Sequence, residues 1–231
     1  MNRMQIFAAV GVFLVLVVIG AWQFSPRTAV SPSVEEQSQP PISETNNAAS
    51  LDAKVIPPKT ASRPTQHPLP LSGGDIVASW DFKGAYAGNP ELTAKAQSEI
   101  LRLSELLVTA TSSEMILSVG VANQYELLGD GKKQYEYLGR AIRAEEMNGL
   151  PWHNIGVLME KLGAYKTART AYEKSAFVQP EMKFYHYAYI EFLMTRMGDD
   201  TEIIEKAFAF AEKNIGQTPY LIQLRADWEK S

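Results

Sequence analysis

The chain has 231 residues and a net charge of −4, and 45 % of its residues are apolar. This length favours one or two domains, and the apolar share is enough for an ordinary hydrophobic core. Cysteine is absent, which excludes disulfides, thiolate metal sites, cysteine nucleophiles and lipidated cysteine anchors. The negative charge argues against a protein that follows a nucleic-acid backbone, because such a protein needs clustered Lys and Arg.

The amino-terminal stretch, residues 1–24, predicts a membrane anchor. Met4 to Phe24 are 21 residues without a formal charge, and a helix that rises about 1.5 Å per residue can then cross a hydrocarbon core of about 30 Å. A cleaved secretory signal is the alternative, since the charged start at Arg3 is short. Against cleavage, Ile19 to Phe24 offer no convincing pair of small residues before a cut. Positive charge on the two sides, Arg3 against Arg27 with glutamates soon after it, slightly favours an extracytoplasmic location for everything after the anchor.

Residues 25–72 are predicted to form a disordered linker. Nine of the 13 prolines lie here, among Ser, Thr, Gln, Asn and Ala. Proline removes a backbone donor and restricts the residue before it, so we expect no packed core in this stretch. A flexible chain of this length has an end-to-end distance of about 40 Å. A proline-rich ligand for another protein's groove is the alternative interpretation.

Aromatic and aliphatic residues return after Gly73. Ile76, Ala78, Trp80 and Phe82 alternate with more polar positions, as in a short strand. No second strand is predicted nearby to pair with it. We therefore expect an irregular or short helical lead-in that lays Trp80 and Phe82 on the helices that follow. A second possibility is that these two aromatic residues occupy the domain's own groove as an internal ligand.

A helix is predicted to begin at Asn89, with Pro90 at its first position and Glu91 favourable to its amino-terminal dipole. It is expected to end near Val108. Its apolar face recurs at helical spacing and comprises Ala96, Ile100, Leu103 and Leu107. Residues 111–113, Thr-Ser-Ser, then supply a turn and the next N-cap.

The following stretch repeats itself at a fixed spacing along the chain. Shifting Leu150–Met182 back by 34 places these residues on one another: Val121-Ala122 on Ile155-Gly156, Gly129 on Gly163, Leu138 on Tyr172 and Ala141 on Ser175. Shifting it forward by 34 matches Tyr189-Ile190 and Leu193, after which Ile204, Phe208 and Ala211 match at an offset of 36. The turn at 198–200 is therefore two residues longer than the turn of the central unit. Residues 218–228 read as an amphipathic helix that closes the series.

Within Leu150–Met182, the order of residue types resembles one tetratricopeptide repeat, a helix-turn-helix unit that commonly binds other proteins. The residues that carry the resemblance are Trp152, Ile155-Gly156, Gly163, Ala168, Tyr172 and Pro180. The resemblance covers about residues 114–215, although Ser118, Gln134 and Glu146 depart from the family pattern in the first unit. It implies an all-α fold, an α-solenoid of helical hairpins with a capping helix. The predicted transmembrane helix and disordered linker precede this solenoid. The implied hairpins lie at about 115–148, 149–182 and 183–217, within a helical domain spanning 73–231, and the cap at 218–229.

No sequence pattern indicates catalysis. His67, His153 and His186 belong to no metal motif, and the chain contains no HExxH pair, Gly-rich phosphate loop or nucleophile elbow. Asp199-Asp200 lacks the further acidic ligands of a calcium loop. We therefore expect no enzyme activity, no cofactor and no metal.

In the tetratricopeptide family, the first helices of successive units line a groove that holds an extended peptide or a helix. The resemblance therefore implies these outward residues as candidates for protein binding: Asn123, Glu126, His153, Asn154, Val157, Phe184, Tyr187 and Glu191. An asparagine side chain can both donate to and accept from a peptide backbone. The family's basic clamp for a terminal carboxylate is not expected, because Val119, Phe184 and Ala188 stand where its basic residues would be. Alternatively, Phe184 and Tyr187 pack against the capping helix and Asn154 is only a consensus residue.

The folded part, from residue 73 onward, carries 17 Lys and Arg against 22 Asp and Glu, so a partner with apolar anchors and some positive charge is expected. Together these features predict a single-pass, membrane-tethered scaffold that binds a protein or peptide in the cell envelope, with no nucleic acid. An accessory chaperone of the secretion machinery, which an anchor plus a repeat domain also resembles, is one alternative. A cleaved and secreted repeat protein is the other.

Overall fold

A computed structural model of the protein describes residues 66–109 and 113–230. Within these ranges the fold is all-helical, with an irregular segment at residues 66–89, called the lead-in below, before the first described helix. The helices are α2 (Pro90–Thr109), α3 (Glu114–Leu128), α4 (Gly131–Ala144), α5 (Gly149–Lys161), α6 (Tyr165–Val178), α7 (Lys183–Arg196), α8 (Thr201–Ile215) and α9 (Pro219–Trp228).

The predicted anchor at Met4–Phe24 and nearly all of the predicted linker at 25–72 lie outside the described ranges, and both stay predictions. None of the helices that are described is long and apolar enough to cross a membrane.

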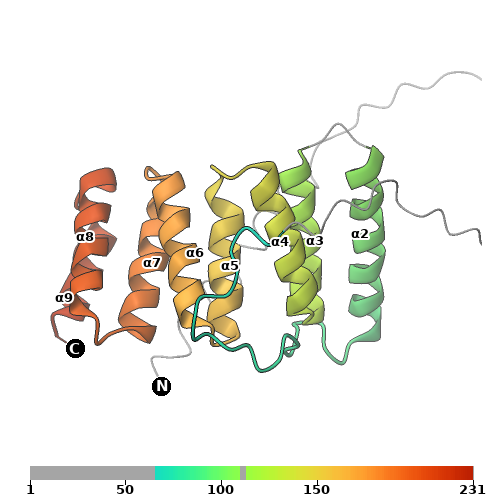
Figure 1. The fold of residues 1–231 in the computed structure, drawn as a ribbon, viewed down its shortest axis with the longest axis horizontal. Helices are drawn as coiled ribbons and strands as arrows, with labels where there is room; N and C mark the ends of the chain where they lie inside the picture. Colours follow the sequence, from blue (N-terminus) through green and yellow to red (C-terminus); the bar gives the residue numbers. More distant parts are fainter. Residues whose placement is uncertain (1–65, 110–112, 231) are drawn as a thin grey trace, which may run out of the picture. The chain divides into compact units, whose positions relative to one another are not determined.

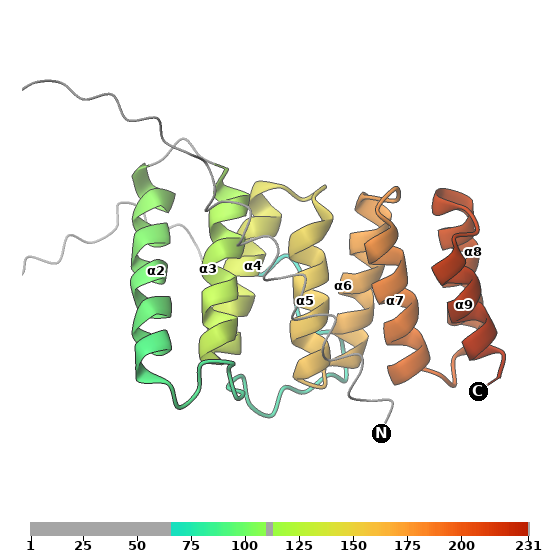
Figure 2. The same cartoon turned by 180° about the vertical axis from the view of Figure 1, so that it is seen from behind.

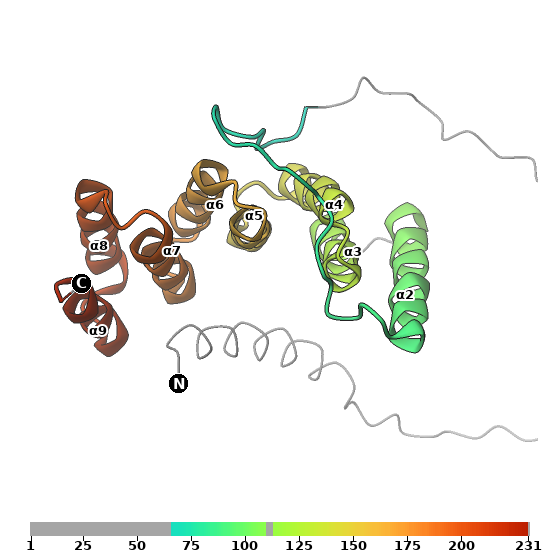
Figure 3. The ribbon, with the colours of Figure 1, turned by 90° about the horizontal axis from the view of Figure 1, so that it is seen from below.

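Successive helices lie side by side in chain order from α2 to α9 (Figures 1 and 2). Each of the pairs α3 with α4, α5 with α6 and α7 with α8 is an antiparallel hairpin with a short turn, and α2 packs on α3 at one end. At the other end α9 packs on both α7 and α8. Seen from below, the helices form two layers, with α3, α5 and α7 in one and α4, α6 and α8 in the other (Figure 3).

The two predicted N-caps, at Asn89 and at Ser113, are confirmed. Asn89 accepts a hydrogen bond from the backbone N–H of Leu92 (3.1 Å) at the start of α2, and Ser113 caps α3. Gly129 and Gly163 end α3 and α5 with φ of 86° and 76°. In this left-handed region a side chain is strained, so glycine is the residue of choice.

The main core lies between the two layers of helices. The predicted small and large positions are buried there: Ala122, Leu138, Ala141, Ile155, Ala168, Tyr172, Phe208 and Ala211. At Gly156 the two helices of the central hairpin approach so closely that a Cβ would lie 2.8 Å from the ring of Tyr172. This contact explains the glycine, because any side chain would push the helices apart.

The lead-in is irregular, as predicted, and Trp80 and Phe82 are half-buried against the core. Its packed part begins earlier than Gly73. His67 stacks on the ring of Tyr135 with 3.5 Å between centroids, and Leu69 is buried in the main core. The stretch from His67 to residue 72, assigned to the linker from its prolines, therefore belongs to the folded part.

The middle of the lead-in caps α6. The residue before this helix is Ala164, which makes no side-chain cap. In its place the carboxylate of Asp75 accepts hydrogen bonds from the backbone N–H of Thr167 (2.7 Å) and Lys166 (3.3 Å) and from the Thr167 hydroxyl (2.7 Å). A carboxylate at this position satisfies exposed donors and favours the positive end of the helix dipole.

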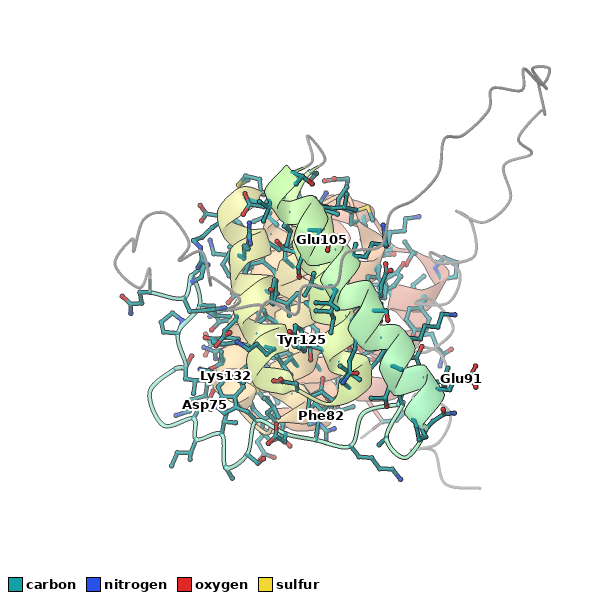
Figure 4. The ribbon with its side chains drawn as sticks, turned by 90° about the vertical axis from the view of Figure 1, so that its right-hand side faces the viewer. Asp75, Phe82, Glu91, Glu105, Tyr125 and Lys132 are labelled. Atoms are coloured by element: carbon teal, nitrogen blue, oxygen red, sulfur yellow. The ribbon has the colours of Figure 1, made fainter. Side chains whose placement is uncertain are left out.

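The end of the lead-in follows the α3–α4 turn. The carbonyl of Trp80 accepts from Gly131 N–H, and Phe82 N–H donates to the Gly129 carbonyl, both at 3.0 Å. Figure 4, viewed from the α2 end, shows the lead-in passing from Asp75 at the side of the helices to Phe82 beneath them. Among the described residues, the hydrogen bonds and ring contacts of Trp80 and Phe82 go to α4, to the α3–α4 turn and to Lys161 at the end of α5, whose Nζ lies 4.4 Å from the Phe82 ring centroid. Lys161 is not a predicted groove residue, so these contacts give no support to the internal-ligand alternative.

We predict that Asp75→Ala lowers the free energy of unfolding by about 1–2 kcal/mol, because α6 loses its cap. Urea denaturation of the full chain measures this loss. Asp81→Ala is the matched control, since Asp81 lies in the same segment with an exposed side chain. An equal loss in both variants would contradict the capping role.

We also predict that Gly139→Ala is destabilising by about 1–3 kcal/mol, as expected for overpacking. A Cβ at residue 139 would lie 2.3 Å from Nε2 of His67, so the lead-in would have to shift. In a His67→Ala background the same change should be neutral, or stabilising by up to about 1 kcal/mol, because alanine is the better helix former. Additive effects in the double variant would argue against this contact.

Candidate functional site

The eight candidate residues come from three helices of one layer. Asn123 and Glu126 lie on α3, residues 153, 154 and 157 on α5, and residues 184, 187 and 191 on α7. These eight positions define the first-helix face, and α3, α5 and α7 succeed one another along it in Figure 3. Their side chains are not equally available, as the contacts below show.

At the α3 end, Asn123 is half-buried, and Glu126 is already engaged. Glu126 forms an ion pair with Lys161 at the end of α5 (2.8 Å) and accepts from the amide of Gln134 (3.4 Å). The pair joins two successive hairpins. A partner would have to compete with Lys161 for this carboxylate.

The centre of the face differs from the prediction at His153. This side chain is only 9 % exposed, and its ring contacts those of Phe184 (4.7 Å) and Tyr172 (5.5 Å). Burial lowers the pKa of His153 to about 4, and its Nδ1 has no hydrogen-bond partner in the described part. His153 is therefore a neutral packing residue beneath the surface, because Phe184 of the next hairpin covers it.

Asn154 and Val157, by contrast, remain half-exposed beside it. Val157 packs with one side against the main core. Phe184 is 43 % exposed although it contacts His153. Asn154 on α5 and Phe184 on α7 thus both keep exposed surface on this face.

At the α7 end the capping helix covers the face. The hydroxyl of Tyr187 shares a hydrogen bond with that of Thr218 (2.6 Å), and its ring meets Tyr220 edge-on at 4.9 Å. Glu191 accepts a hydrogen bond from Tyr220, and burial raises the pKa of the Glu191 carboxyl. For Tyr187 the structure thus favours packing against the cap, whereas Phe184 packs against His153 instead.

A second ion pair repeats the first one along the layer. Glu160 of α5 pairs with Arg196 at the end of α7 (2.9 Å) and accepts from the Tyr172 hydroxyl (3.0 Å). In both pairs the acid and the base lie slightly more than one repeat length apart in the sequence. This spacing is the sequence signal that could have predicted the two ion pairs. Each pair is half-exposed and contributes little stability by itself, but each joins α5 to a helix of a neighbouring hairpin and neutralises one acid.

The described residues contain no group of three or more His, Asp or Glu side chains placed to hold a metal ion. The first-helix face thus keeps three partly exposed side chains, Asn123 on α3, Asn154 on α5 and Phe184 on α7, while Glu126, Tyr187 and Glu191 are already engaged. Amides and an aromatic ring can recognise the backbone and one apolar side chain of a protein ligand.

We predict that His153→Phe reduces the acid sensitivity of the fold. The unfolded chain protonates a histidine near pH 6.5, whereas the folded protein keeps His153 neutral down to about pH 4. Stability is therefore full above pH 6.5 and falls by up to about 3 kcal/mol as the pH drops to 4. Urea titrations at both pH values should show a smaller fall in the variant. An unchanged difference would mean that this ring does not remain buried and neutral.

A scan against protein-family models found no match for this chain, and a search among curated proteins found none.

Proposed function

We propose that the chain is a membrane-tethered scaffold of tetratricopeptide type, an α-solenoid that binds protein partners through the first-helix face. The observation that carries the proposal is the partial exposure of three side chains on this face, Asn123, Asn154 and Phe184, the last of which is 43 % exposed. The three residues come from three successive hairpins. An elongated ligand that crosses the hairpins would meet all of them.

The spacing of the helices supports a repeat architecture. Helices α4 and α6 begin at Gly131 and Tyr165, and α5 and α7 at Gly149 and Lys183. The residue numbers of the two starts in each pair differ by 34, which is the period of the tetratricopeptide family. Each hairpin packs on the next. Such stacking presents equivalent residues of successive units along one face, which is the usual basis of ligand binding by repeat proteins.

Positioning is the mechanism that we propose. The uncharged segment Met4–Phe24 would hold the chain in the membrane, and residues 25–72 would let the helical domain reach its partners on the extracytoplasmic side. Confinement near a membrane raises the effective concentration of the domain towards other membrane proteins. Binding energy at the face can then be modest.

We predict that the double variant Asn123→Ala/Asn154→Ala and the single variant Phe184→Ala each reduce crosslinking to a defined partner in native membranes by about tenfold or more, as expected for interface anchors. Leu101→Ala is the matched control, because Leu101 is an apolar residue on α2 that is 66 % exposed. Unchanged crosslinking in the face variants would contradict binding at this face. Equal capture of unfolded chains of any sequence would favour the accessory chaperone instead.

We further predict that the mature protein retains residues 1–24 and leaves the membrane fraction only with detergent. Intact mass measurement of the protein purified from its own membranes tests the first point, and extraction with salt, alkali and detergent tests the second. A mass that lacks the contribution of residues 1–24 would favour the secreted repeat protein.

A further inference from the structure

The two long edges of the row of helices differ in their contacts. At the lower edge in Figure 1, α3, α5 and α7 end and α4, α6 and α8 begin. There the lead-in holds the α3–α4 turn through Trp80 and Phe82, and the start of α6 through Asp75. The connections between hairpins lie at the upper edge, α4–α5 at residues 145–148 and α6–α7 at residues 179–182.

The two connections at the upper edge each present an acid followed by an exposed methionine. The pairs are Glu146-Met147 and Glu181-Met182. Met147 is 68 % exposed and Met182 is 42 % exposed, and Leu150, the second residue of α5, is exposed beside the first pair. Successive hairpins thus offer the same combination of negative charge and apolar surface. We call these five residues the connection edge.

The acids of the two connections are not neutralised by a base. Neither connection contains Lys or Arg. Glu145, Glu146 and Glu181 form no ion pair with any residue that the structure describes. The carboxylate of Glu145 accepts from the hydroxyl of Ser113 (2.8 Å) and from the amide of Asn148 (3.3 Å), which are neutral donors. This edge therefore offers negative charge to a partner.

A hollow of about 340 Å³ joins the two connections. Its lining residues are Glu145, Glu146, Met147, Asn148 and Gln179. Gln179, the residue after α6, reaches the start of α5, where its side-chain oxygen accepts from the N–H of Gly149 (2.7 Å). The hollow thus places two carboxylates beside an apolar thioether. A Lys or Arg side chain matches this combination, because its stem is apolar and its end is charged.

The chemistry of the connection edge selects among its possible occupants. Methionine side chains adapt to apolar partners of different shape. The carboxylates beside them favour a positively charged partner and oppose an anionic lipid surface. In a two-fold dimer each copy would offer the same surface, so acids would meet acids. A basic and partly apolar segment of another protein therefore fits better than lipid or a second copy.

We propose that the connection edge binds a basic amphipathic helix of a partner protein, whose apolar side chains pack on the two exposed methionines while a Lys or Arg side chain enters the hollow. In such a helix, residues three and four apart share one face, so apolar and basic side chains can meet the edge together. This surface is additional to the first-helix face, and its occupation does not depend on the proposed function.

Selection on the full chain, held in an uncharged detergent, tests the proposal. The probe is a displayed library of helical peptides whose positions vary among Leu, Ala, Gln, Lys and Glu. We expect enriched peptides to repeat leucine at spacings of three and four residues and to contain more Lys than Glu. Salt should weaken their binding, because part of the attraction is between opposite charges.

Paired substitutions at the connection edge locate the bound peptide. Glu146→Gln/Glu181→Gln and Met147→Ser/Met182→Ser should each raise the dissociation constant of enriched peptides by about tenfold or more, as for interface anchors. All four side chains are exposed, so these variants are expected to fold normally, and urea denaturation checks this.

Two control variants separate this surface from other sites. Glu91→Gln/Glu229→Gln removes the same charge from exposed acids at the lower edge, where α2 begins and α9 ends. Asn123→Ala/Asn154→Ala changes the first-helix face. Neither variant should alter the dissociation constant of the enriched peptides.

Several results would overturn the proposal. Among them are no peptide enriched above background, peptides richer in Glu than in Lys, and binding that neither variant of the connection edge weakens. An equal loss with Glu91→Gln/Glu229→Gln would show attraction by net charge alone. Loss only with Asn123→Ala/Asn154→Ala would place the peptides on the first-helix face, which supports the proposed function and not this one. A dimer of the chain that Met147→Ser/Met182→Ser abolishes would assign the edge to a second copy.

Discussion

A helical hairpin of this kind leaves one apolar side uncovered until a neighbour packs on it, and the described fold follows from this constraint. The central hairpin buries Ile155, Ala168 and Tyr172 because α4 precedes it and α7 follows it. At the start of the row, α2 supplies Ile100 and Leu103 to a smaller cluster on α3. At its end, α9 places Trp228 on Phe208 of α8. Helices α2 and α9 thus bury the apolar sides that α3 and α8 would otherwise expose.

The same constraint explains the lead-in. The outer side of the α4 and α6 layer has no further layer of helices among the described residues, so its gap is filled by an extended segment that contributes Leu69 to the core. That segment also provides the carboxylate of Asp75, which satisfies the uncapped start of α6. Packing and capping therefore come from one stretch of chain, which ties it firmly to the helices.

Local chemistry made much of the fold predictable. The N-cap at Asn89, the turn glycines at 129 and 163 and the regular spacing of the hairpins each act within a few residues or within one period, so they can be read without knowledge of distant contacts. The cap of α6 could not be read in this way. Ala164 gives no local signal, and its substitute, Asp75, lies far away in the chain. The candidate site shows the same division, because helical spacing identified which residues share the first-helix face, whereas the burial of His153 depends on Phe184 of the next hairpin.

The ion pairs beside the first-helix face weaken the link between the net charge of the domain and the charge of its partner. The folded part has 22 acidic against 17 basic residues, which suggested a partner with positive charge. Yet Glu126 on the first-helix face and Glu160 on α5 are paired with Lys161 and Arg196. Because a paired acid attracts a further cation only weakly, net charge says little about recognition there. Specificity at this face would then depend on the amides and Phe184.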